Sequence, residues 1–258
     1  MFGVGIGVRV NVPRFVGLIH NYMPPTWHFQ KSPIVERLYS FIVSDREPRP
    51  GAQHFHLLFG DAQNLARTHR KEQLLEAFEA DVNNYIAQAA RLRLFVHAGV
   101  VGWKGQAIVI PGLSRSGKTT LVKEFLQHGA SYYSDEFAVF DERGYVSPFA
   151  KPLGIRKGAN QEQTRVLPGR FGSSVGVEAL HVGLLLFTRY QRSARWKPKT
   201  MTVGGGMLGL FANTLVAREQ PERALTLLER VARGAQILKG DRGDARNVVR
   251  AVLDRLAS

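Results

Sequence analysis

The chain has 258 residues, of which 44% are hydrophobic and 22% charged, and it contains no cysteine. This length allows one large domain, or a domain with a smaller appendage, and the composition excludes disordered, collagen-like and coiled-coil chains. The absence of cysteine excludes disulfides, thiolate metal sites and a cysteine nucleophile. Because 35 Lys and Arg oppose 21 Asp and Glu, the net charge of +14 favours an anionic partner.

Neither a membrane span nor a secretion signal is found in the sequence. The longest apolar run, about Val182–Phe187, is far shorter than the ~20 residues that cross a bilayer. The glycine-rich start carries no charge ahead of its apolar stretch, and no small-residue cleavage site follows it. We therefore expect a cytoplasmic protein without a membrane partner.

Residues 1–90 are predicted to form a β-rich lobe with antiparallel strands. Strands are expected at Val4–Val10, Ile34–Val43 and His54–Phe59, because β-branched and aromatic residues gather there. Turn-forming residues interrupt the chain at Met23–Thr26 and Glu47–Gly51.

The lobe is predicted to end in an amphipathic helix over Lys71–Ala90. Its apolar residues fall at helical spacing and its acidic residues lie largely on the opposite side, as expected for a helix that packs on a sheet. Before it, His54 and His56 are two residues apart, but no third metal ligand accompanies them. We interpret both histidines as residues on the surface of a strand.

Residues 91–258 are predicted to form a second, α/β domain. The apolar runs Leu92–Val101 and Gln106–Ile110 predict a hairpin, and a helix is expected over Lys118–His128 with Gly129 as its C-cap. Gly204–Gly206 is interpreted as a flexible loop. Further strands are expected at Ala130–Tyr133, Phe137–Phe140, Tyr145–Ser147, Val182–Phe187 and Ala235–Leu238, and further helices at Pro221–Arg233 and Asp244–Leu256.

A nucleotide-binding motif lies between the Gln106–Ile110 strand and the following helix. The segment Gly112–Thr119 matches the P-loop pattern, in which backbone amides cradle phosphates, Lys118 contacts the β- and γ-phosphates and Thr119 ligates Mg²⁺. The strand before it and the helix after it are the context that this mechanism requires. The residues predicted to contact the nucleotide are Gly112, Leu113, Ser114, Arg115, Ser116, Gly117, Lys118, Thr119 and Thr120, although the Arg115 side chain is expected to point to solvent.

Two adjacent carboxylates follow the next expected strand. Asp135 and Glu136 come directly after Ala130–Tyr133, where one carboxylate can contact a metal ion and the other can serve as general base. The alternative is a solvated turn between two strands.

Residues 92–156 resemble the C-terminal catalytic domain of HPr kinase/phosphorylase, and more closely the HPr-kinase-like proteins of bacterial biosynthetic clusters. His97-Ala98-Gly99 is similar to the family's His-Gly element and places His97 21 residues before Lys118. Gly112–Thr119 corresponds to its P-loop. Asp135 and Glu136, 17 and 18 residues after Lys118, correspond to its paired aspartates.

The resemblance implies an α/β fold of the HPr kinase/PEP carboxykinase type, with a P-loop kinase core on a mixed sheet that transfers phosphate from ATP to a serine hydroxyl. It implies that Lys118 binds phosphates, that Thr119 and Asp135 hold Mg²⁺, and that His97 lies near the transferred phosphate. Glu136 occupies the position of the family's proton acceptor. Because Glu136 replaces an aspartate and is one methylene longer, either it or Asp135 can be the base.

Positive charge is concentrated in residues 151–200, which hold ten Lys and Arg against two Glu, a local net charge of +8. Within it, Gly154–Gly158 is similar to a family segment that holds Mg²⁺, but Ile155 stands in place of the glutamate. Arg156 and Lys157 are the candidates for contacts to phosphate or substrate. An acidic peptide fits this excess of charge, as does a solvated surface.

The sequence therefore predicts an ATP- and Mg²⁺-dependent kinase acting on a hydroxyl, with a serine of a peptide or small protein as acceptor. In the related cluster-borne proteins the acceptor is a biosynthetic precursor peptide, for example the terminal serine of a lasso-type precursor. A small-molecule kinase and a non-catalytic nucleotide-binding protein are the alternatives. No nucleic-acid-binding signature is found, and a homo-oligomer is compatible with the family resemblance.

Overall fold

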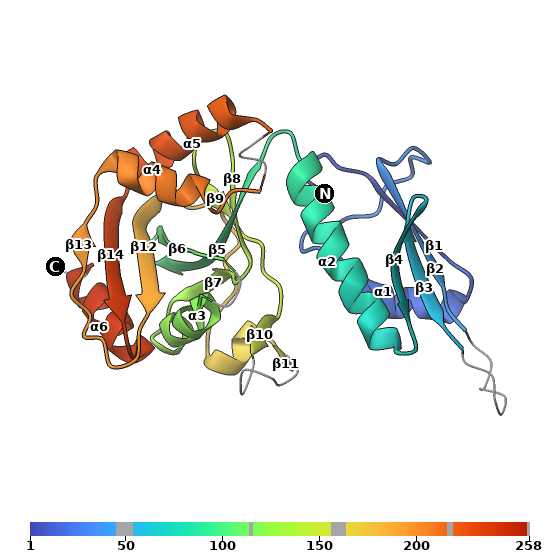
Figure 1. Cartoon of the computed structure of the whole chain (residues 1–258), viewed down its shortest axis with the longest axis horizontal. Coiled ribbons are helices and arrows are strands. Elements are labelled where there is room, and N and C mark those ends of the chain that lie inside the picture. The colour runs from blue at the N-terminus through green and yellow to red at the C-terminus, as the bar shows by residue number, and fades with distance from the viewer. Residues whose placement is uncertain (45–53, 114–115, 156–163, 216–218, 257–258) are drawn as a thin grey trace. The chain divides into compact units, whose positions relative to one another are not determined.

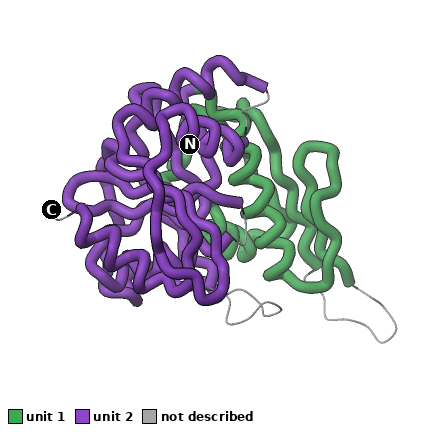
Figure 2. Tube along the Cα trace, turned by 60° about the vertical axis from the view of Figure 1, so that its left-hand side comes forward, with its two compact units in different colours: residues 1–91 green, residues 92–258 purple. Residues whose placement is uncertain are grey.

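The computed structural model describes residues 1–44, 54–113, 116–155, 164–215 and 219–256. The chain divides into two compact units, Met1–Arg91 and Leu92–Ser258 (Figure 2). Both units combine helices with a mixed sheet, so the expected mixed α/β class is confirmed. Within the described ranges, no helix is long and apolar enough to cross a membrane.

The first unit contains one four-stranded sheet in the order β1-β2-β3-β4. β1 runs parallel to β2, whereas β2, β3 and β4 pair antiparallel, so the expectation of an antiparallel lobe is wrong for its first strand. The long connection between β1 and β2, which includes η1 and α1, permits this parallel crossover. The elements are β1 (Ile6–Val10), η1 (Pro13–Phe15), α1 (Val16–His20), β2 (Arg37–Ile42), β3 (His56–Gly60), β4 (Gln63–Thr68) and α2 (Lys71–Ala89).

Aromatic side chains join α2 to the sheet of the first unit. Phe78 of α2 lies with its ring centroid 5.0 Å from that of Tyr39 and 5.2 Å from that of Phe41, and all three residues are buried. The Tyr39 hydroxyl donates a 2.6 Å hydrogen bond to Asp81, which also pairs with Arg37 at 2.9 Å. The predicted amphipathic helix is thus held on the sheet by buried aromatic contacts and by the hydrogen bond and ion pair of Asp81 beside them.

His56, the first residue of β3, lies in a different environment from the one that the sequence predicts. His56 is buried rather than on the surface of the strand, and its Nδ1 accepts a 3.1 Å hydrogen bond from the Ser44 backbone amide. Burial lowers the pKa of His56. Among the described residues no group of three His, Cys, Asp or Glu side chains is arranged to hold a metal ion.

The second unit is built on a large mixed sheet in the order β13-β14-β12-β6-β5-β8-β9, with β7 also paired to β5 (Figure 1). β12 pairs parallel with both β6 and β14, and the other pairs are antiparallel. A small hairpin, β10 (Leu153–Ile155) with β11 (Thr164–Val166), lies outside this sheet. The strands of the large sheet are β5 (Leu94–Trp103), β6 (Gln106–Pro111), β7 (Ser131–Ser134), β8 (Phe137–Phe140), β9 (Val146–Ser147), β12 (Val182–Tyr190), β13 (Lys199–Thr200) and β14 (Gln236–Arg242).

Helices cover both faces of this sheet, as the near-continuous apolar character of its central strands requires. On β6, Ala107 and Val109 belong to the core beneath α4 and α5, whereas Ile108 and Ile110 belong to the core beneath α3 and α6. Successive residues of the strand point to opposite faces of the sheet, so the position of a residue along β6 decides which helices its side chain contacts. The helical elements are α3 (Lys118–Gln127), η2 (Pro168–Phe171), α4 (Val203–Phe211), α5 (Pro221–Arg233) and α6 (Ala245–Arg255).

The glycine run Gly204–Gly206 is helical, so its interpretation as a flexible loop is wrong. The Thr202 hydroxyl caps the first turn of α4 by accepting a 3.2 Å hydrogen bond from the Gly205 amide. A Cβ at Gly206 would lie 2.5 Å from a methyl group of Ile237 on β14. The small residues therefore let α4 lie against the sheet at close range.

Gly99 of β5 allows a similar close approach of α3. A Cβ at this buried position would lie 2.6 Å from a methyl group of Val122, whereas a Cβ at exposed Gly204 would meet nothing within 4 Å. We expect Gly99→Ala to lower the free energy of unfolding by about 1–3 kcal/mol through overpacking. Gly204→Ala is expected to raise it by about 0.5–1 kcal/mol. Urea denaturation of both variants tests this, and shifts of the same sign would contradict it.

Candidate functional site

The Gly112–Thr119 segment joins the carboxyl end of β6 to the first turn of α3, as the sequence predicts. The Gly112 amide donates a 3.0 Å hydrogen bond to the His97 carbonyl, which ties the segment to β5. A Cβ at Gly112 would lie 2.6 Å from the Ser116 hydroxyl, and Gly117 has a φ of 86°. The backbone therefore requires glycine at position 117, and Gly112 leaves room for the Ser116 side chain. Ser114 and Arg115 lie outside the described residues.

Lys118 is folded back over the segment that precedes it. Its side chain is 9% exposed, and its ammonium donates a 2.8 Å hydrogen bond to the Leu113 carbonyl. Burial lowers the pKa of Lys118, and the charges of Asp135 and Glu136 oppose this effect. An ammonium group is thus held against the Leu113 carbonyl, near two carboxylates.

Thr119 and Thr120 occupy the first turn of α3, where backbone amides lack helical partners. Thr119 is half-buried and its hydroxyl lies near enough to Asp135 to lower the pKa of that carboxyl, whereas Thr120 is exposed. Of these two threonines, the structure therefore brings Thr119 to the carboxylates.

Asp135 lies between β7 and β8 with its carboxylate enclosed. Burial raises the pKa of Asp135 to about 7, although the Thr119 hydroxyl, the Lys118 charge and the Gly154 amide each lower it. Its Oδ1 is out of contact with solvent and has no hydrogen-bond partner within the described parts of the chain. A carboxylate with a pKa near neutrality suits proton transfer at physiological pH.

The carboxylate of Glu136 is engaged in an ion pair that the sequence did not reveal. The Lys151 ammonium lies 2.7 Å from its Oε2, and the Lys151 side chain is only 15% exposed. Asp135 and Glu136 thus differ: the first has an unpaired buried oxygen, and the second faces a cation.

His97 of β5 lies on the face of the sheet that α3 covers. The centre of its ring is 4.8 Å from the centre of the Phe137 ring, and the Ala98 amide next to it donates a 3.2 Å hydrogen bond to the Glu136 carbonyl. Burial lowers the pKa of His97, and the nearby Lys118 charge lowers it further. The structure therefore places His97, Lys118, Thr119 and the two carboxylates in one site. Arg156 and Lys157 lie outside the described residues.

Arg242 is a residue of this site that sequence reasoning missed. Its side chain extends from the end of β14 and is 3% exposed, with Nη2 donating a 3.0 Å hydrogen bond to the Gly117 carbonyl. Its Nη1 donates to the Gly243 carbonyl at 3.2 Å, and burial lowers the pKa of Arg242. A guanidinium group therefore holds the turn that begins α3.

The donor set fits a magnesium ion. Mg²⁺ prefers hard oxygen ligands and usually takes one or two from protein and the rest from phosphate and water. The Thr119 hydroxyl and the unpaired Oδ1 of Asp135 offer such oxygens at the mouth of the glycine-rich turn.

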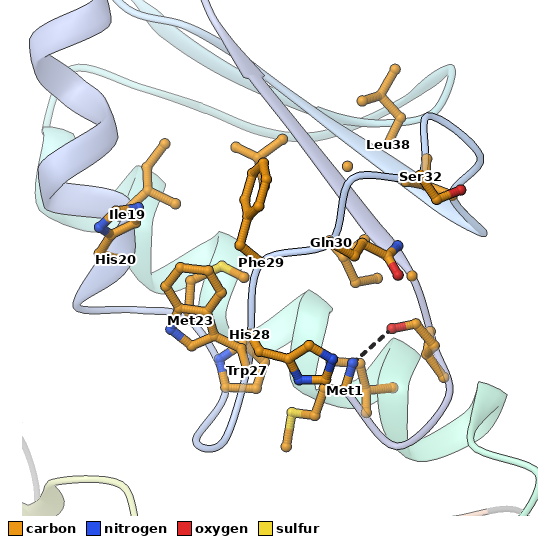
Figure 3. Close-up of a pocket in the computed structure, with 18 of the residues that line it drawn as sticks. Met1, Ile19, His20, Met23, Trp27, His28, Phe29, Gln30, Ser32 and Leu38 are labelled. Carbon is orange, nitrogen blue, oxygen red and sulfur yellow. Dashed lines mark hydrogen bonds between the residues drawn. The ribbon is translucent and has the colours of Figure 1, made fainter.

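A separate cavity of about 500 Å³ lies in the first unit (Figure 3). Ile19, Met23, Trp27 and Phe29 are among its lining residues, which include no Asp, Glu, Lys or Arg. The Met1 amino group is the charged group among the described lining residues, and a cavity without a carboxylate is not suited to phosphoryl transfer, so the candidate site is the one at the start of α3.

Comparisons with known proteins find similarity to solved structures alone. No protein-family model and no curated protein sequence matches the chain. The solved structure of the HPr(Ser) kinase/phosphatase from Coxiella burnetii matches 63% of this chain and 95% of its own, with 11% sequence identity and a TM-score of 0.34.

Proposed function

We propose that this chain is a phosphotransferase that moves the γ-phosphate of ATP to a hydroxyl group, with a serine of a peptide or small protein as acceptor. One observation carries the proposal: Asp135, a buried carboxylate whose Oδ1 has no hydrogen-bond partner among the described residues, lies close enough to Lys118 and Thr119 for both to lower its pKa. A nucleotide-binding turn and a carboxylate suited to accept a proton therefore meet at the start of one helix.

The chain's own groups supply binding, orientation and a proton acceptor. The amides at the start of α3 and Lys118 hold the β- and γ-phosphates, and Arg242 supports the turn through the Gly117 carbonyl. Asp135 accepts the proton of the acceptor hydroxyl while the oxygen of that hydroxyl forms a bond to the γ-phosphorus. The bond from that phosphorus to the β–γ bridging oxygen breaks, and ADP leaves.

The Thr119 hydroxyl and one carboxylate oxygen of Asp135 would hold Mg²⁺, and the other oxygen of Asp135 would remain as the proton acceptor. When bound, the ion neutralises charge on the phosphate oxygens. Glu136, paired with Lys151, lies beside this position and maintains the local balance of charge.

The test is a transfer assay with purified full-length protein, terminally labelled ATP, Mg²⁺ and a size-fractionated extract of the source organism. We expect label in a peptide or protein fraction, and none with Lys118→Met, which removes the ammonium but keeps the aliphatic stem. Label confined to small molecules would contradict the peptide acceptor and support a metabolite kinase. Transfer by Lys118→Met at the wild-type rate would contradict the whole proposal.

A second candidate function is a non-catalytic nucleotide-binding protein of regulation or assembly. The ion pair between Glu136 and Lys151 supports it, because a carboxylate already paired at 2.7 Å is less free to act in catalysis. ATP binding without transfer to any fraction would favour this alternative.

A further inference from the structure

A cationic cavity lies on the opposite face of the large sheet from α3. It has a volume of about 830 Å³ and is formed where β6, β12 and β14 end, together with the segment that leads into β13. Pro111, the last residue of β6, lines it and directly precedes Gly112 of the candidate site. The carboxyl ends of parallel strands are the usual ligand-binding edge of an α/β sheet.

Five cationic side chains and one carboxylate line this cavity. The carboxylate, Asp241, is engaged by Arg189 through two hydrogen bonds of 2.8 and 2.9 Å. The other four cations are exposed: Arg195, Lys197, Lys199 and Lys239. The charge of Lys239 also acts on Asp241, whereas the first three form no ion pair within the described part of the chain.

Three of these cations follow one another at a spacing of two residues. Arg195, Lys197 and Lys199 line the cavity, whereas the intervening Trp196 and Pro198 pack against Gly240 of β14. Alternate side chains of an extended chain are about 7 Å apart on one side. The same spacing separates alternate side chains of an extended peptide, so an acidic peptide can align its carboxylates with this row.

The sheet edge offers a backbone surface next to the row. β13 is the edge strand and pairs only with β14 among the described strands (Figure 1). An extended peptide can add to an exposed edge through backbone hydrogen bonds, while its side chains provide specificity.

We infer that this cavity binds an acidic, extended segment of the peptide acceptor through Arg195, Lys197, Lys199 and Lys239. The inference rests on the proposed function and specifies its acceptor. The acidic segment docks on one face of the sheet at the end of β6, and the hydroxyl to be phosphorylated reaches the site at the start of α3.

The experiment measures binding of a fluorescein-labelled hexaglutamate peptide to the full-length chain by fluorescence anisotropy, without nucleotide. We expect binding that weakens as salt rises and is absent for a hexaglutamine peptide. The variant Lys197→Ala/Lys199→Ala/Lys239→Ala is expected to bind about tenfold more weakly. The matched control, Arg91→Ala/Arg143→Ala/Arg250→Ala, loses the same charge at exposed positions outside the cavity and is expected to change affinity less than about twofold.

Three results would overturn the inference. Equal weakening in the two triple variants would show attraction to net charge alone. Unchanged peptide binding with increased aggregation of the lysine variant would show that these lysines only protect the sheet edge. A parallel loss of affinity for a fluorescent ATP analogue would assign the cavity to the nucleotide. Because the peptide assay contains no ATP, a chain that binds hexaglutamate through these lysines but transfers no phosphate would refute the proposed function and leave the cavity assignment intact.

Discussion

Replacing Asp135 with asparagine is expected to reduce phosphate transfer by about 100- to 10,000-fold while ATP affinity changes only a few-fold. Asparagine keeps the size of the carboxyl group and an oxygen that faces Thr119 and Gly154, so the local structure is retained. It removes the proton acceptor and the negative charge offered to the metal ion. Single-turnover transfer and binding of a fluorescent ATP analogue, measured on the same preparation, separate the two effects.

Two further variants make this experiment decisive. Glu136→Gln is expected to cause a smaller loss, because Glu136 is paired with Lys151. A larger loss in Glu136→Gln than in Asp135→Asn would assign the base to Glu136. Asp254→Asn, at an exposed position of α6, controls for the loss of a carboxylate elsewhere.

The same substitution has a pH-dependent effect on stability, measured without nucleotide or metal. Burial raises the pKa of Asp135 from 3.8 to about 7, so the folded chain holds a proton that the unfolded chain has already lost between these values. The contribution of the Asp135 carboxyl to the free energy of unfolding is fully present below pH ~4 and is lost as the pH rises through ~7. Asparagine does not titrate. The free energy of unfolding of Asp135→Asn is therefore expected to exceed that of wild type by near zero at pH ~4 and by a few kcal/mol above pH ~7. An equal advantage at both ends of this range would contradict the buried, protonated carboxyl.

Lys118→Met is expected to weaken ATP binding by about 100-fold or more, because a buried ammonium aimed at phosphates is lost without a substitute. The methionine stem still packs where the lysine stem does, so the fold is retained. The change also removes the 2.8 Å hydrogen bond to the Leu113 carbonyl and releases the preceding turn.

Lys123→Met is the matched control for this second prediction. Lys123 lies on the same helix and its ammonium is 5.9 Å from the centre of the Phe171 ring. We expect ATP affinity within about twofold of wild type, since a half-exposed cation away from the helix start contributes little. Equal losses in the two variants, measured by calorimetry, would place the nucleotide elsewhere.

Much of this site could be predicted because its residues lie close in sequence or have strict backbone requirements. The glycines of Gly112–Thr119, the strand before them and the helix after them form a local pattern, and the structure places this segment as expected. Asp135 and Glu136 follow a short strand whose partner is β5, so they reach Lys118 through one antiparallel pairing.

The groups that sequence reasoning missed depend on long-range pairing. The expected strand ended at Leu238, because Lys239, Gly240, Asp241 and Arg242 are polar or lack a side chain, yet β14 continues through Arg242. Parallel pairing with β12 extends the strand to the edge where Arg242 meets Gly117. Local propensity does not show such tertiary effects. The same holds for Gly204–Gly206, whose helix depends on packing against Ile237.

The contact between Arg242 and Gly117 joins positions 125 residues apart. A growing polypeptide therefore displays the complete Gly112–Thr119 motif long before it contains the guanidinium that holds its turn. Domains form from the N-terminus during synthesis, but this turn can take its final shape only after residue 242 has left the ribosome. A chain that ends before β14 would contain the motif but would lack the arginine that holds its turn. The ability to bind ATP would therefore arise late in synthesis, together with the C-terminal part of the sheet.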